Sequence, residues 1–146
     1  MARANLELVI ALRRTAARLE TDVTYRWSHY GMCNCGHLAQ TVTALSPREI
    51  HEAALSREGD WGTLAREYCA STGYRLDHIL DTMLELGLSR DDIQSLERLD
   101  ASRVLDRLPE GERDLRHYDR GDAIRYMRAW ADLLEDELGG SRMAAK

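Results

Sequence analysis

The segment 25–40, YRWSHYGMCNCGHLAQ, is the most chemically dense part of the chain. It holds two of the three cysteines and two of the five histidines. Thiolate and imidazole groups are ligands for soft metals, and a thiolate is also a nucleophile and a redox centre. The string Cys33-Asn34-Cys35-Gly36-His37 is therefore a candidate metal site or reactive-thiol site.

A metal is the first interpretation of this string. Three thiolates and one imidazole form a ligand set that suits tetrahedral zinc, with iron as the alternative metal. Structural zinc sites usually separate paired ligands by about two to four residues, so a separation of one residue leaves the metal unspecified. His29 and His51 are reserve ligands should His37 not serve. The predicted ligands are Cys33, Cys35, His37 and Cys69.

Thiol chemistry is the second interpretation. If a helix begins with Asn34 as its N-cap, Cys35 lies in the first turn, where exposed amides and the helix dipole lower a thiol pKa. Cys35 is then the candidate nucleophile, with His29 as the candidate base. Cys33 and Cys35 could also form a strained, easily reduced disulfide. Simple packing competes with both interpretations for Cys35 and Cys69, because cysteine behaves as a small hydrophobe.

The residues around Cys35 resemble the nucleophile segment of NlpC-type cysteine peptidases. The shared features are Tyr25-x-Trp27 and Asn34-Cys35-Gly36-His37-Leu38-Ala39-Gln40, since in that family an aromatic stretch leads to a cysteine that opens a helix. The resemblance covers about sixteen residues and implies a nucleophilic Cys35. The family would next need strands that deliver a histidine, whereas the residues after Leu45 have helical patterns. An acidic residue usually precedes the family's cysteine, and Asn34 stands there instead.

Length and charge limit the remaining possibilities. The chain has 146 residues, enough for one domain that folds without a disulfide or metal. Its net charge of −5 and its mixture of both signs disfavour nucleic acid and membrane partners. The first twenty residues lack the uninterrupted apolar run of a secretory signal, and an odd cysteine count favours a reducing compartment. We therefore expect a cytoplasmic protein.

Helical periodicity dominates the sequence. It predicts an all-α, compact bundle of about six to seven short-to-medium helices within a single domain at 1–138, with a flexible tail at 139–146. Ser46-Pro47-Arg48-Glu49 is a capping box with proline at the first helical position. One further helix is predicted to bury a stripe from Trp61 to Cys69 and to stop at Gly73. The other predicted N-caps are Asp60, Ser89, Asp100 and Asp122.

One segment lacks the helical period. Val23, Tyr25, Trp27 and His29 alternate with polar residues, which is typical of extended backbone. No second strand is predicted, and an isolated strand is not stable. We therefore expect an extended aromatic loop at 23–34 that packs against the bundle.

Two other functions fit parts of the pattern. Residues 79–97 resemble a helix-turn-helix with Gly87 at the turn, although the second helix is predicted to expose Asp91, Asp92 and Glu97, which opposes DNA binding. The last helix carries apolar and cationic residues beyond its core stripe, which is typical of an interface and allows a homodimer. These residues are Arg125, Tyr126, Arg128, Trp130 and Leu133.

Overall fold

Local capping signals explain where three of the helices begin. Ser46 Oγ accepts a hydrogen bond from Glu49 N, and Glu49 Oε1 accepts one from Ser46 N. Asp60 accepts from Thr63 N, and Ser89 accepts from Asp92 N. These bonds satisfy amides that have no partner within the helix. The capping predictions at Ser46, Asp60 and Ser89 are confirmed.

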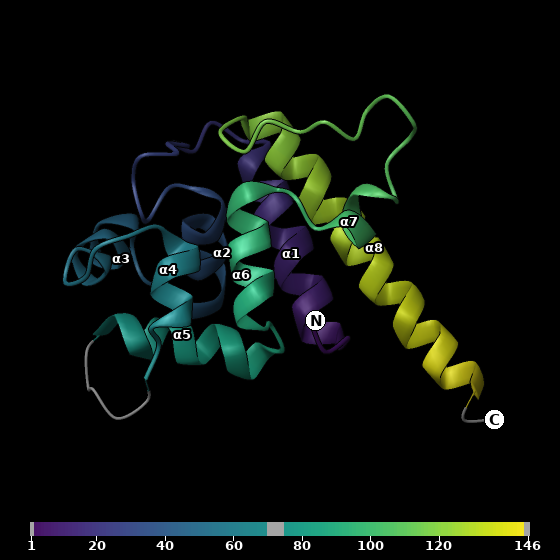
Figure 1. The fold of residues 1–146 in the computed structure, drawn as a ribbon, viewed down its shortest axis with the longest axis horizontal. Helices are drawn as coiled ribbons and strands as arrows, with labels where there is room; N and C mark the ends of the chain where they lie inside the picture. Colours follow the sequence, from purple (N-terminus) through teal and green to yellow (C-terminus); the bar gives the residue numbers. More distant parts are fainter. Residues whose placement is uncertain (1, 70–74, 145–146) are drawn as a thin grey trace.

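The computed structural model describes residues 2–69 and 75–144, and this part of the chain folds into eight helices with no strand (Figure 1). The all-α prediction is confirmed, with slightly more helices than expected. The helices are α1 (Leu6–Leu19), α2 (Asn34–Thr43), α3 (Pro47–Ala54), α4 (Trp61–Arg66), α5 (Arg75–Leu86), α6 (Arg90–Arg98), α7 (Ser102–Leu105) and α8 (Arg120–Ala144). None of the described helices is both long and apolar enough to cross a bilayer.

Two predicted caps are wrong. Ala101, not Asp100, precedes the first residue of α7. Asp119 lies just before α8, and its Oδ2 accepts from Asp122 N at 2.9 Å. Asp122 is therefore an acidic residue of the first turn, where its negative charge still interacts favourably with the positive end of the helix dipole.

Two predicted helix ends also differ. The helix that begins at Trp61 ends at Arg66, so Cys69 is not part of it and is exposed, not buried. The predicted stop at Gly73 lies outside the described residues. The last helix continues past Gly139 to Ala144, because glycine costs a helix only about 1 kcal/mol relative to alanine.

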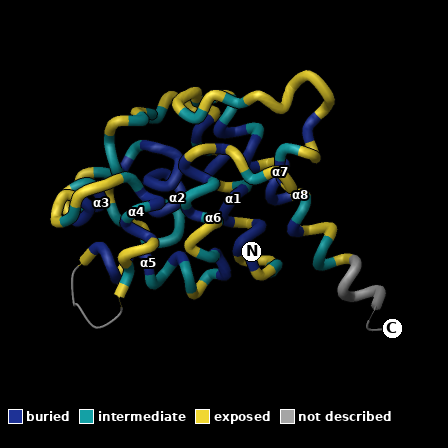
Figure 2. Tube along the Cα trace, in the orientation of Figure 1, coloured by how far each residue is buried: buried dark blue, intermediate teal, exposed yellow. Residues whose placement is uncertain are grey.

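The second helix occupies the middle of the bundle. It contacts α1, α3, α5 and α6, while α8 packs along α1 and α4 packs along α6. Residues 34–39, the first part of α2, are all buried (Figure 2). The chemically dense segment of the sequence therefore lies in the core.

The aromatic loop crosses one end of the bundle between α1 and α2 (Figure 1). Its residues Tyr25, Trp27 and Tyr30 are partly buried and pack against the core. Residues 23–33 contain neither helix nor strand, and Asn34 begins α2. The expectation of an extended loop held by aromatic side chains agrees with this arrangement.

The helix-turn-helix pattern corresponds to α5, a turn at Gly87 with φ of 121°, and α6. Both α4 and α2 pack against α6, which lies near the centre of the bundle (Figure 1). Glu97, predicted to be exposed on this helix, is instead only 3% exposed. The packing of α6 does not favour its use as a recognition helix.

The wide apolar face of α8 belongs to the core. Tyr126 is 1% and Trp130 is 3% exposed. The expectation that these two side chains contribute to an interface is therefore wrong. Leu133 is partly buried against the same core. The breadth of this apolar face reflects the packing of α8 on α1 and α7.

Two glycines allow the loop and its neighbouring helices to approach closely. A Cβ at Gly31 would lie 2.1 Å from Pro47 O, and one at Gly36 would lie 2.2 Å from Tyr30 O. Both contacts are with backbone atoms, which cannot move without shifting an element of the fold. These glycines are required for close packing.

We predict that Gly36→Ala lowers the free energy of unfolding by about 2 kcal/mol or more, because the new methyl group forces backbone apart. Gly139→Ala is the control, since no described atom lies within 4 Å of its added Cβ. That variant should gain up to about 1 kcal/mol from helix propensity. Urea denaturation measures both changes, and equal effects at the two positions would contradict the packing role.

Candidate functional site

The two buried cysteines lie at the start of α2. Cys33 occupies the N-cap position and Asn34 is the first helical residue, so the helix begins one residue earlier than predicted. Cys35 lies in the first turn, as expected, and its amide donates to Glu97 Oε1 at 3.1 Å. A side chain from α6 therefore accepts the hydrogen bond of an amide that the N-cap side chain of a helix would usually satisfy.

Glu97 is the central residue of this cluster. Its carboxyl group is buried, accepts a hydrogen bond from the Cys35 amide and interacts with both thiols. No Lys or Arg side chain of the described residues lies within ion-pair distance of it. Burial raises the pKa of Glu97 to about 7, because the charged form loses its hydration.

The same burial acts on the two thiols. It raises the pKa of both Cys33 and Cys35 well above that of an ordinary thiol, and the nearby negative charge of Glu97 adds to the effect. The expectation that the helix N-terminus lowers the pKa of Cys35 is therefore wrong. Loss of water around a fully buried sulfur outweighs the favourable helix dipole.

Cys33 differs from Cys35 in its hydrogen-bond donors. The amide of Gly36 and the indole N–H of Trp61 both favour the thiolate of Cys33 and partly oppose the effect of burial on its pKa. The Cys33 thiol itself donates to Tyr30 O at 3.6 Å, and the Cys35 thiol donates to Ile93 O at 3.2 Å. Of the two sulfurs, Cys33 has the surroundings better suited to carry a negative charge.

Asn34 holds the cluster together from the other side. Its Nδ2 donates to Glu97 O at 3.0 Å and to His117 O at 2.9 Å. Its Oδ1 accepts from the Tyr25 hydroxyl at 2.5 Å. One buried side chain thus joins the aromatic loop, α6 and the connection before α8, which fixes the position of Cys33 and Cys35.

His37 has a structural role in this arrangement. Its Nε2 donates to Thr24 O at 2.9 Å, and its Nδ1 lies 3.3 Å from Arg18 Nη2, which can only donate. Burial lowers the pKa of His37 to about 4, so the ring is neutral at pH 7. Neither ring nitrogen has a lone pair left for a metal.

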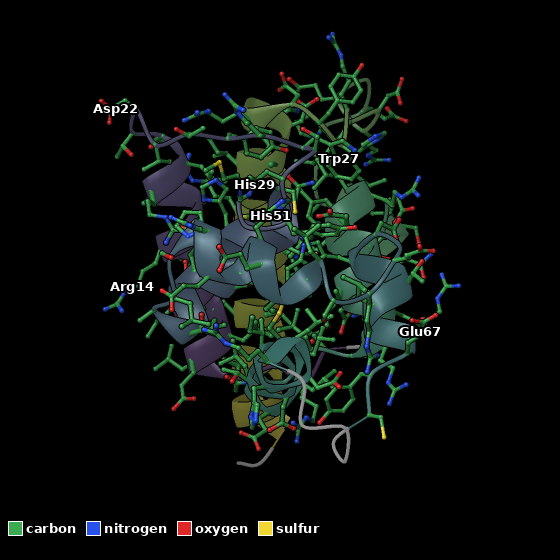
Figure 3. All side chains as sticks on the ribbon, turned by 90° about the vertical axis from the view of Figure 1, so that its left-hand side faces the viewer. Arg14, Asp22, Trp27, His29, His51 and Glu67 are labelled. Atoms are coloured by element: carbon green, nitrogen blue, oxygen red, sulfur yellow. The ribbon has the colours of Figure 1, made fainter. Side chains whose placement is uncertain are left out.

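His29 and His51 form a stacked pair with ring centroids 4.0 Å apart (Figure 3). His29 Nδ1 accepts from Gly31 N at 3.0 Å, and His51 Nδ1 accepts from Tyr30 N at 3.1 Å. Each Nε2 therefore carries the proton of the neutral ring. A metal on Nε2 would move that proton to Nδ1, directly opposite a backbone N–H, so neither ring fits the role of reserve ligand.

The structure does not bring the four predicted metal ligands together. Cys69 is exposed, whereas Cys33 and Cys35 are buried. In residues 2–69 and 75–144, no three His, Cys, Asp or Glu side chains form a group able to hold a metal ion. What the structure joins instead is two thiols and one carboxyl group.

Comparison with known proteins gives no significant match: no family model, curated protein or solved structure is similar to this chain. The chemistry of the site must therefore be inferred from its own geometry.

Glu97 is predicted from the sequence to be exposed, because acidic residues on a helix usually face solvent, but the structure buries it. One feature of the sequence nevertheless indicates that Glu97 is buried. Glu97 lies four residues after Ile93 and directly after Leu96, and both of these side chains are buried in α6. Position 97 therefore falls on the core face of the helix by spacing alone.

We predict a specific pH dependence from Glu97. The folded protein keeps this proton up to pH 7, whereas the unfolded chain releases it near the ordinary value of 4.5. The contribution to stability is therefore complete below about pH 4.5 and falls by about 3 kcal/mol as pH rises to about 7.

His37 acts in the opposite direction, since its lowered pKa makes stability fall as pH drops from 6.5 towards 4. Glu97→Gln removes the pH dependence of stability that comes from Glu97 and leaves the one that comes from His37. The variant should therefore gain about 3 kcal/mol relative to the wild type between about pH 4.5 and pH 7 in urea denaturation. A difference between the two proteins that stays constant across this range would contradict a raised pKa.

Proposed function

We propose that this protein performs thiol–disulfide redox chemistry, in which Cys33 and Cys35 alternate between a dithiol and a disulfide. The supporting observation is the buried Glu97 carboxyl group, which contacts both thiols and has no cationic partner among the described residues. Buried ionisable groups with strongly shifted pKa values are concentrated at functional sites. Glu97 is the proton acceptor in this proposal, in place of the expected base His29.

The pKa of Glu97 suits that role. A general base works best when its pKa lies near the working pH, and that of Glu97 is raised to about 7. It contacts both sulfurs, so it can take a proton from one thiol and later from the other. A buried thiol of high pKa needs such an acceptor in contact with it before it can react as a thiolate.

We assign the attack to Cys33, because the Gly36 amide and the Trp61 indole favour its thiolate. With a hydroperoxide as the oxidant, Glu97 takes the Cys33 proton and the sulfur attacks one peroxide oxygen. The O–O bond breaks, the leaving alkoxide takes the proton from Glu97, and Cys33 becomes a sulfenic acid.

Cys35 then completes the reaction. Glu97 takes its proton, and the Cys35 sulfur attacks the Cys33 sulfur. The S–O bond breaks and hydroxide leaves as water with the proton from Glu97. In total, two thiols and one hydroperoxide give one disulfide, one alcohol and one water. The burial of both sulfurs favours a small oxidant over a folded protein disulfide.

The ring closed by such a disulfide is short. One residue separates the two cysteines, and strained disulfides are the labile ones that thiols readily reduce. We therefore infer a reversible redox centre in which the disulfide is not a structural crosslink.

The proposal predicts that hydrogen peroxide converts the reduced Cys69→Ser protein into a form that lacks two hydrogen atoms by mass spectrometry. The bond should join Cys33 to Cys35 and should be reversed by dithiothreitol. Glu97→Gln should slow the oxidation roughly 100-fold, the usual contribution of a general base, and should remove the rise in rate near pH 7. Glu58→Gln is the control, because that carboxylate is exposed.

Two results would contradict the redox proposal. One is oxidation that proceeds only to a sulfinic acid while the folded protein forms no Cys33–Cys35 disulfide. The other is a stoichiometric zinc or iron ion in the purified protein that protects both thiols and is released by Cys33→Ser, which would support the metal interpretation instead.

A further inference from the structure

Two stacked imidazoles hold the turn that precedes Cys33. His29 comes from the aromatic loop and His51 from α3, and their ring planes differ by 21° (Figure 3). The amides of Tyr30 and Gly31 are consecutive in the chain, and each donates to the Nδ1 of one ring. The pair thus fixes two successive peptide units of this turn.

The same turn covers the Cys33 sulfur. Tyr30 O accepts both the Cys33 thiol and the Trp61 indole N–H, the latter at 3.1 Å. The amide of Cys33 donates to His29 O at 3.0 Å. A shift of Tyr30 would therefore remove a direct partner of the thiol and uncover a cysteine residue that is now 1% exposed.

Only neutral rings can make these bonds. A protonated imidazole carries hydrogen on both nitrogens, so its Nδ1 can no longer accept from a backbone amide. Two charged rings with centroids 4.0 Å apart would also repel each other. Proton uptake by either ring breaks one bond to the turn, and uptake by both separates the pair.

We propose that the His29–His51 pair is a proton-operated latch on residues 29–33, which is closed at neutral pH and opens on acidification to uncover Cys33. This inference rests on the proposed function for its purpose, namely the control of access by a small oxidant to a buried thiol. The mechanical step itself involves no redox reaction.

The surroundings of the pair favour the closed state near neutral pH. Burial, the neighbouring His51 and Arg26 all lower the pKa of His29. On α3, Arg48 and Glu52 pair with each other at 3.0 Å. The Tyr30 ring lies 5.5 Å from His51, and its hydroxyl donates to Gly59 O. In the described part of the chain, no carboxylate forms an ion pair with either imidazole.

The latch predicts that the Cys33 thiol becomes more accessible as pH falls. In Cys69→Ser protein, the rate of Cys33 modification by 4,4′-dithiodipyridine is measured at about pH 5 and about pH 7.5, on either side of histidine's ordinary pKa of about 6.5. Each rate is divided by that of a small thiol at the same pH. The normalised rate should rise at least about tenfold on acidification, the effect of one linked proton over about one pH unit.

The control is the double variant His29→Asn and His51→Asn. Asparagine Oδ1 can accept the same amides but does not take up a proton, so the normalised rate should not rise on acidification. A wild-type rate without pH dependence, or an equal rise in the double variant, would overturn the latch. Far-UV circular dichroism at both pH values identifies any general unfolding, which would also overturn it.

A second measurement needs no variant. Amide hydrogen exchange of Tyr30 and Gly31 should lose protection as the pH is lowered from about 7.5 to about 5, while that of Leu38 in α2 stays protected. Protection of Tyr30 and Gly31 that does not change over this range contradicts the latch. Neither experiment depends on disulfide formation, so failure of the latch is distinguishable from failure of the redox proposal.

Discussion

The burial of one carboxyl group without a cation is the constraint around which this fold is arranged. Removing a charged carboxylate from water costs several kcal/mol unless donors replace the lost hydration. Glu97 accepts from the Cys35 amide and interacts with the two thiols, and all three groups belong to the start of α2. The first turn of α2 must therefore face α6, which places the chemically dense segment inside the bundle.

The loop and its glycines follow from this placement. Because α2 begins in the core, the chain must enter the core through a tight turn, and only glycine fits at Gly31 and Gly36, where backbone atoms of neighbouring segments approach within about 2 Å of an added Cβ. Asn34 then links the start of α2 to α6 through Glu97 O and to the connection before α8 through His117 O. The same contacts that stabilise the fold also control which molecules can reach the sulfurs, so structure and proposed chemistry depend on one set of residues.

Structure that depends on local signals could be predicted from the sequence, whereas the surroundings of individual side chains in the folded protein could not. The capping box at Ser46 and the apolar periods act within one turn of helix, so they specify helices without knowledge of the partner elements. The pKa of Cys35 and the contact of Glu97 with both thiols depend on which helix packs against which, and spacing along one helix does not contain that information. The interpretation of Cys69 as a core ligand failed for a related reason, since its helix ends at Arg66 before the apolar stripe is complete.

The central claim is that Glu97 holds a proton near neutral pH because it is buried between two thiols. Carbon-13 NMR of protein labelled at the glutamate carboxyl carbon, assigned with Glu97→Gln, measures this directly. We predict a titration midpoint near 7 in the reduced protein, and a different midpoint once a Cys33–Cys35 disulfide removes both thiol groups. A midpoint near the ordinary value of 4.5 that does not change on oxidation would contradict the account.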